Sequence, residues 1–162
     1  MVRAVVESGR AGDVALFTGN DDHILLDLLT EYAPATSQEG QRVRMVGGLL
    51  GQWACGTRCA VAMLEECKQA LAAGIVPSRL LTLAAQLTDF NAALFDAAHA
   101  FAGCIPGIQE ILRRQGLLAN DLCLDTRETL SPGQAGEIDR VCRAYPRLLD
   151  DEFVAAHRAE WL

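Results

Sequence analysis

The stretch Val14-Ala-Leu-Phe-Thr-Gly-Asn-Asp-Asp-His23 decides the fold class of this chain. It begins with a four-residue apolar run, and Thr18–Asp22 then supplies residue types that form turns and cap helices. A second apolar segment, Ile24–Leu29, follows at once. A buried strand that ends in glycine and leads into a capped helix is the basic β/α unit, and sites in such folds lie at the carboxyl ends of strands. We therefore expect any chemistry first at Gly19–His23.

Length and composition are those of a soluble globular chain. The 162 residues are 51% hydrophobic, which suits one domain with a sizeable core. The net charge of −7 and the sequence pI of about 4.9 disfavour a nucleic-acid partner. No run approaches the roughly 20 apolar residues of a membrane span, and no N-terminal segment has the pattern of a secretory signal. We predict a cytoplasmic protein with no membrane partner.

The six cysteines are predicted to be reduced thiols buried as small apolar side chains. A chain of this length without a signal sequence is typical of a reducing compartment. Cys55, Cys59 and Cys67 share one probable helix, the other three are scattered, and the sequence has no Cys-x-x-Cys pair. A metal or redox site is the alternative, but zinc sites usually show tighter ligand spacing. We therefore expect neither a metal nor a cofactor.

Apolar periodicity and turn residues predict two strands and a series of helices. The strands are 14–17 and 43–46, and the helix between them favours parallel pairing. The helices are expected at residues 1–8, 21–32, 53–73, 79–102, 106–115, 132–144 and 151–161. Loops are expected at 33–41 and 117–130. The expected N-caps are Asp21 or Asp22, Ser131, and Asp150 or Asp151.

This order of elements matches the last quarter of an eight-stranded β/α barrel with a C-terminal helical extension. Val14–Asp22 resembles the seventh strand and its Gly-Asp-Asp-type turn in the dihydrodipicolinate synthase/N-acetylneuraminate lyase family. Val43-Arg-Met-Val-Gly-Gly48 is similar to the eighth strand. The later segments that resemble the family's helices and connections are Trp53–Ala73, Arg79–Ala102, Cys104-Ile-Pro-Gly-Ile108, Gln115-Gly-Leu-Leu118 and Leu130-Ser-Pro-Gly-Gln134.

The resemblance implies an α/β fold that is mostly helical by content. Residues 1–74 would be the C-terminal part of an aldolase-type TIM (β/α)8 barrel, and residues 75–162 a helical bundle packed on it. A complete barrel takes roughly 250 residues, and two strands cannot close one. We therefore expect a fragment or truncated homologue that needs an N-terminal barrel half or associates as a homo-oligomer.

The resemblance also implies Schiff-base lyase or synthase chemistry on pyruvate or a related 2-oxo acid. In that family a lysine at the end of the sixth strand attacks the substrate carbonyl, and the iminium serves as an electron sink. A tyrosine from the fourth strand and a threonine element from the second assist, and none of the three can be matched here. The only lysine, Lys68, falls in the helix after the eighth strand and is not a candidate nucleophile. The chain alone is expected to be inactive.

Five residues are expected to bind substrate at the barrel mouth. Gly19, Asn20 and Asp21 follow the first strand, and Gly47 and Gly48 end the second. Glycine allows close backbone approach to a ligand, and Asn or Asp can hydrogen-bond a substrate hydroxyl or carboxylate. The alternative is a strand-to-helix turn with a capping residue and tight packing at a strand end. No catalytic residue is expected within the chain.

Two other functions stay open. Unpaired strand edges and amphipathic helices would suit a non-enzymatic interaction module. Asp96 and His99, three residues apart on an expected helix alongside Asp89, correspond to half of a helix-bundle metal site. The sequence has no second half, so a hydrogen-bonded histidine is favoured over a metal ligand.

Overall fold

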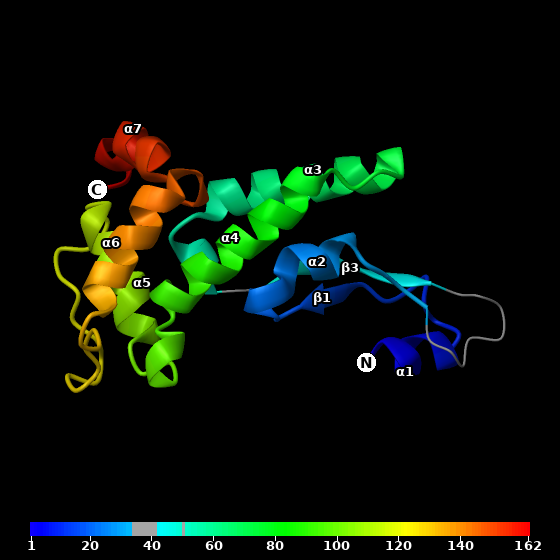
Figure 1. The fold of residues 1–162 in the computed structure, drawn as a ribbon, viewed down its shortest axis with the longest axis horizontal. Coiled ribbons are helices and arrows are strands. Elements are labelled where there is room, and N and C mark those ends of the chain that lie inside the picture. The colour runs from blue at the N-terminus through cyan, green and yellow to red at the C-terminus, as the bar shows by residue number, and fades with distance from the viewer. Residues whose placement is uncertain (34–41, 50) are drawn as a thin grey trace. The chain divides into compact units, whose positions relative to one another are not determined.

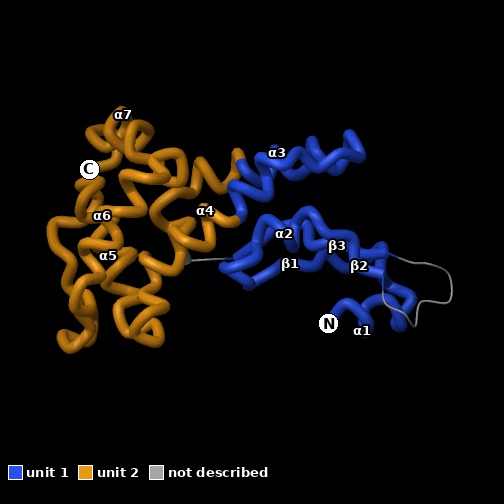
Figure 2. Tube along the Cα trace, in the orientation of Figure 1, with its two compact units in different colours: residues 1–50, 63–84 blue, residues 51–62, 85–162 orange. Residues whose placement is uncertain are grey.

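The computed structural model describes residues 1–33, 42–49 and 51–162, so the expected loop at 33–41 lies almost wholly outside the described residues. The chain is an α/β protein, mostly helical, and the described part holds one small sheet (Figure 1). It divides into two compact units, residues 1–50 with 63–84 and residues 51–62 with 85–162 (Figure 2). The division expected at residue 74 stays a prediction. None of the described helices combines the length and apolar character needed to cross a bilayer.

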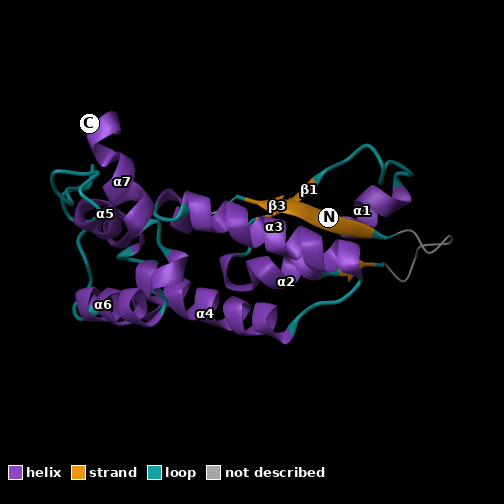
Figure 3. Cartoon of the chain, turned by 90° about the horizontal axis from the view of Figure 1, so that it is seen from above, coloured by secondary structure: helices purple, strands orange, loops and turns teal. Residues whose placement is uncertain are grey.

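The first unit is built around a sheet of three strands. Its elements are α1 (Val2–Glu7), β1 (Leu16–Thr18), η1 (Asp21–His23), α2 (Ile24–Leu29), β2 (Glu31–Tyr32) and β3 (Val43–Gly48), followed by the adjoining parts of α3 (Thr57–Ala73) and α4 (Ser78–Leu94). The strand order is β1-β3-β2, with β1 parallel and β2 antiparallel to β3. Figure 3 shows the parallel pair β1 and β3 side by side. The parallel pair joined through a helix confirms the predicted pairing. The short strand β2 was not expected.

The core of this unit follows from the apolar runs that predicted its elements. Val6 of α1 packs with Leu16 and Val43 of the two parallel strands. The apolar face of α2 is buried and contacts both β1 and β3; its buried residues are Ile24, Leu25 and Leu28. This packing holds the two parallel strands beneath the helix that connects them.

The helix predicted over 21–32 is wrong at both ends. Asp21 and Asp22 lie inside the 3-10 turn η1, whose N-cap is Asn20, and the N-cap of α2 is His23, without a side-chain hydrogen bond. At the other end, Thr30 is extended and the next two residues pair with β3. The carboxylate of Glu31 accepts from Arg42 at 2.7 Å and from Arg44 at 3.1 Å, which ties it to β3 rather than to a longer helix.

The second unit is an array of helices. It contains η2 (Gly51–Ala54), the remaining parts of α3 and α4, η3 (Ala97–His99), α5 (Cys104–Arg114), α6 (Gln134–Ala144), η4 (Pro146–Leu148) and α7 (Asp151–Trp161). Its most buried apolar residues are Leu87, Phe90, Leu94, Ile111, Ile138 and Val141. The stop at Gly116 (φ +75°) and the irregular segment 117–130 confirm the prediction.

The helix predicted over 79–102 ends early, at Leu94. Asp96, Ala100 and Phe101 all have positive φ, which is incompatible with a continuous α-helix. Burial of the Asp96 carboxylate in a polar cluster stabilises this turn, as described below. The expected position of Asp96 and His99 on one helix is therefore wrong.

Two predicted N-caps cap nothing in their own helices. The N-cap of α6 is Gly133, with φ +86°, while the Ser131 hydroxyl bonds to a distant carboxylate. Asp150 precedes α7 but makes no side-chain bond to it. Its carboxylate accepts instead from the amides of Arg58 and Cys59, at 2.7 and 2.9 Å, and so caps the first turn of α3. Both residues have side chains that can cap a helix, but tertiary packing determines which groups they hydrogen-bond.

Candidate functional site

The carboxyl ends of β1 and β3 lie side by side at one edge of the sheet. Thr18 is in register with Gly48, and the amide of Leu49 donates to the Thr18 carbonyl oxygen at 3.1 Å. Because the two strands are parallel, the residues that follow them emerge at the same edge. The structure therefore brings together the two predicted groups, residues 19–21 and residues 47–48.

The glycines of this edge have different roles. The ring of Phe17 lies over Gly47, where a Cβ would come within 2.6 Å of a ring carbon, so this glycine serves strand packing. The pairing register shifts between Leu16 and Phe17, so that Phe17 is opposite Gly47. At Gly19 a Cβ would meet no atom within 4 Å. Gly19 and Asn20 are both exposed, so their backbone is open to a ligand.

A chain of hydrogen bonds fixes the backbone beneath the edge. The Thr18 hydroxyl donates to Asp27 Oδ2 at 2.5 Å and accepts from the Asn20 amide at 3.1 Å. The Tyr32 hydroxyl donates to the other Asp27 oxygen at 2.7 Å. Burial and the hydrogen bond to Asp27 raise the pKa of Tyr32 to about 12, so the phenol remains a donor at neutral pH. Sequence reasoning missed this network; its signal was the single acid inside the apolar run Ile24–Leu29.

Asp21 is the titratable group closest in sequence to the open glycine. Its carboxyl is half-buried in η1, and burial, followed by the charge of Asp22, raises its pKa. The Asp21 carboxyl therefore keeps its proton to a higher pH than an ordinary aspartate does. Across the described ranges, no three His, Cys, Asp or Glu side chains lie close enough to hold a metal ion, and this includes Asp21, Asp22 and His23.

Lys68 lies at the middle of α3, as the sequence indicated. Its side chain is 60% exposed, and its ammonium is 3.9 Å from the Glu65 carboxylate. It borders an apolar cavity of about 150 Å³ lined by residues of α2, β3 and α3. An exposed ammonium beside a carboxylate has neither of the environments that activate a lysine for imine formation, which are desolvation or a neighbouring cation.

Asp96 and His99 form part of a closed polar cluster in the second unit. The Asp96 carboxylate accepts from the Gly103 amide at 3.0 Å and from the Ser131 hydroxyl at 2.5 Å, and it lies 2.6 Å from His99 Nδ1. Burial acts to raise the pKa of Asp96, but these hydrogen bonds together hold it below its ordinary value. Three donors already occupy the carboxylate, so the cluster is an internal connection between turns.

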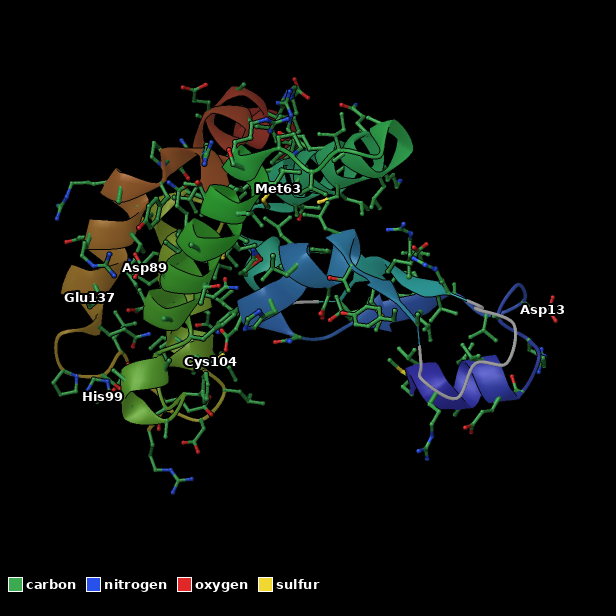
Figure 4. The ribbon with its side chains drawn as sticks, turned by 45° about the vertical axis from the view of Figure 1, so that its right-hand side comes forward. Asp13, Met63, Asp89, His99, Cys104 and Glu137 are labelled. Atoms are coloured by element: carbon green, nitrogen blue, oxygen red, sulfur yellow. The ribbon has the colours of Figure 1, made fainter. Side chains whose placement is uncertain are left out.

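Asp89 does not join Asp96 and His99. It lies on α4 and pairs through both carboxylate oxygens with Arg140 of α6, at 2.7 and 2.8 Å. Arg140 also bonds Glu137, which Figure 4 places on α6, across from Asp89. This network ties two helices of the second unit together.

The six cysteines are free thiols, of which Cys55, Cys67 and Cys123 are buried and the others half-buried. Burial raises the pKa of Cys55 and of Cys59 to about 12 and that of Cys67 to about 11. Thiols with such pKa values carry little thiolate at neutral pH and are poor nucleophiles.

No protein-family model matches the chain, and neither a curated protein nor a solved structure matches it. The strand-end edge is thus described by its own geometry: an open glycine turn, an amide side chain, a carboxyl with a raised pKa and a second strand end beside them. Such an edge offers hydrogen-bonding groups to a small polar molecule, and its described residues, 17–21 and 47–49, include no lysine or cysteine.

Proposed function

We propose that these residues form the last two β/α units and the C-terminal helices of a Schiff-base lyase similar to the dihydrodipicolinate synthase/N-acetylneuraminate lyase family. The observation that carries the proposal is the parallel unit β1–α2–β3, whose two carboxyl ends meet at one edge. In a (β/α)8 barrel the catalytic groups come from the ends of several strands at this face. The long helix α3 follows β3 where the eighth barrel helix would be.

An exposed apolar group on the first strand also supports the proposal. Phe17 is 47% exposed and lies on the face of the sheet that carries Gly47. In a closed barrel, inward-facing side chains fill the interior, and the strands have no free edge. The proposal requires one rearrangement: β2 takes the side of β3 that the first strand of a closed barrel would take. A pairing of two residues is short enough for a complete strand to replace it.

In this proposal the chain shapes the binding site and orients the substrate, and a lysine outside the chain carries out the covalent step. That lysine would form an imine with the carbonyl carbon of a 2-oxo acid, with loss of water. Asn20 and the open backbone at Gly19 would hydrogen-bond the substrate's oxygens. Asp21 would hold or release a proton near them, and the Thr18–Asp27 bond keeps the turn in place.

Borohydride trapping with pyruvate tests the proposal. The 162-residue chain alone is expected to give no reduced adduct, and an adduct on Lys68 would contradict the assignment. The same chain joined to six β/α units encoded beside it is expected to give an adduct on a lysine at a strand end. Asp21→Asn should lower turnover in that assembly, whereas Asp13→Asn, an exposed loop residue near Arg10, should not. An assembly that forms no imine would refute the proposal.

An interaction module is the second candidate, favoured by the exposure of Leu49 (72%) next to Phe17 and by the place of β1 at the edge of the described sheet. This function would make the edge a docking strand rather than part of a barrel. A lysine-bearing barrel half encoded immediately upstream would contradict the module. Size-exclusion chromatography with light scattering adds a check on both candidates, because a stable monomer would contradict association through the exposed strand edge.

A further inference from the structure

A cavity in the helical unit has the charge pattern of a site for a small organic acid. Its volume is about 370 Å³, which is within the range of small-molecule sites. It is lined by residues of α5, α6 and α7 together with Leu149, all within the second unit. It therefore has no connection to the strand-end edge, and the inference does not depend on the proposed function.

Gln115 is a buried amide in the lining of this cavity. The residue is only 8% exposed, and its Nε2 donates to the Cys55 carbonyl and to Asp151 Oδ1, both at 3.0 Å. These two acceptors fix the amide, because a flipped amide would place its oxygen against them. Its Oε1 has no partner within the described part of the chain. Oε1 also has almost no accessible surface, so the acceptor that a ligand can reach here is the Asp151 carboxylate, which is exposed.

Arg158 presents spare donors to the same cavity. Its Nη1 makes one long bond, 3.4 Å, to the Gln115 carbonyl, and it forms no ion pair with the residues that the structure describes. Arg114, the other arginine of the lining, is already paired with Glu110 and Asp139, each at 2.7 Å. A guanidinium offers a planar fork of donors that matches a carboxylate.

The rest of the cavity lining comes from residues of α7 and from apolar side chains. Asp151 and Arg158 are seven residues apart on α7, so they lie on one face of that helix. Ile111, Leu149 and Ala155 add an apolar surface. A cation, an acceptor and a short apolar wall thus line one cavity of limited size.

We infer that this cavity binds a small α-amino or α-hydroxy carboxylate with a short apolar side chain. The carboxylate lies on Arg158, the amino or hydroxyl group donates to the Asp151 carboxylate, and the hydrocarbon packs on Ile111 and Leu149. Both ligand classes share the same chemistry, a carboxylate next to a hydrogen-bond donor.

A matched set of ligands tests this inference on the 162-residue chain by calorimetry and NMR. L-Leucine and L-leucic acid contain every required group, isocaproate lacks the donor, and isoamylamine lacks the carboxylate. We expect saturable binding of leucine, leucic acid or both, and binding at least about tenfold weaker for the two truncated ligands. Preference between leucine and leucic acid identifies the donor as ammonium or hydroxyl. Equal binding of all four, or no binding at millimolar concentration, would overturn the inference.

Variants locate the site. Arg158→Gln should weaken binding at least about tenfold, and Arg158→Lys, which keeps the charge but not the fork, should weaken it less. Arg143→Gln is the matched control, because Arg143 is an exposed arginine of α6 that does not line the cavity. Undiminished binding to Arg158→Gln, or an equal loss in Arg143→Gln, would place the ligand elsewhere. Should Arg158→Gln fail to fold, Arg158→Lys and the truncated ligands still decide the question.

Discussion

Replacing Gly107 with alanine probes a tight contact between two helices of the helical unit. Gly107 lies in α5 against the end of α4, where a Cβ would be 2.0 Å from the Leu94 carbonyl oxygen and 3.0 Å from Gln134 Nε2. Leu94 is fully buried, and its carbonyl accepts from Gln134 Nε2 at 3.2 Å. A backbone carbonyl at a helix end cannot rotate away as a side chain can, so α5 or the end of α4 must move.

Three contributions set the expected magnitude. Alanine is about 1 kcal/mol more favourable than glycine in a helix interior. Overpacking a well-packed site costs roughly 1–3 kcal/mol. Displacing the Leu94 carbonyl also weakens the hydrogen bond from Gln134, at a cost of about 1 kcal/mol. We therefore expect Gly107→Ala to lower the free energy of unfolding by about 1–3 kcal/mol.

Urea denaturation followed by circular dichroism measures this change. Gly136→Ala is the matched control, because Gly136 lies in α6 and a Cβ there would meet no atom within 4 Å. That variant should be more stable than the parent chain by about 1 kcal/mol. The packing argument is refuted if Gly107→Ala is as stable as the parent chain, or if both variants lose stability equally.

Three further outcomes follow from contacts described above. Asp150→Ala removes the acceptor of the Arg58 and Cys59 amides, so it should cost about 1–2 kcal/mol and speed hydrogen exchange at those two amides; unchanged exchange would contradict the cap. The Cys55 thiol, with its pKa raised by burial from 9.0 to about 12, has roughly a thousandfold less thiolate, so iodoacetamide should label it only after unfolding. The Tyr32 phenol, with its pKa raised from 10.0 to about 12, stabilises the fold below pH 10 and loses that contribution between pH 10 and 12, so Tyr32→Phe should flatten this part of the stability profile.

Elements bounded by local turn chemistry could be predicted from the sequence. The helix α1, the stop at Gly74 (φ +67°) and the helix α5 that ends before Gly116 lie where the apolar spacing and glycines place them. Glycine tolerates positive φ at low cost, so such boundaries depend on a few neighbouring residues. Helix ends that depend on distant partners could not be predicted in this way, as the early end of α4 shows.

The same distinction between local sequence and distant partners applies to the candidate site. The adjacency of residues 19–21 and 47–48 follows from two apolar strands joined through a helix, so the sequence was enough to predict it. The Thr18–Asp27–Tyr32 bonds were missed because Tyr32 was expected in a helix, whereas pairing of β2 with β3 turns it toward Asp27. A polar side chain in an apolar run indicates a partner without identifying it.

By itself, the sequence determined the residue types, the apolar periodicity, the parallel strand pair and the absence of any lysine but Lys68. Only the tertiary structure decided which groups meet: Asp150 caps α3 rather than its own helix, and Ser131 bonds Asp96 rather than the start of α6. The physical reason is that the apolar periodicity of the sequence reflects interactions between residues that are close together in the chain, and it does not identify distant partners. A carboxylate or hydroxyl accepts or donates wherever packing brings a partner within about 3 Å.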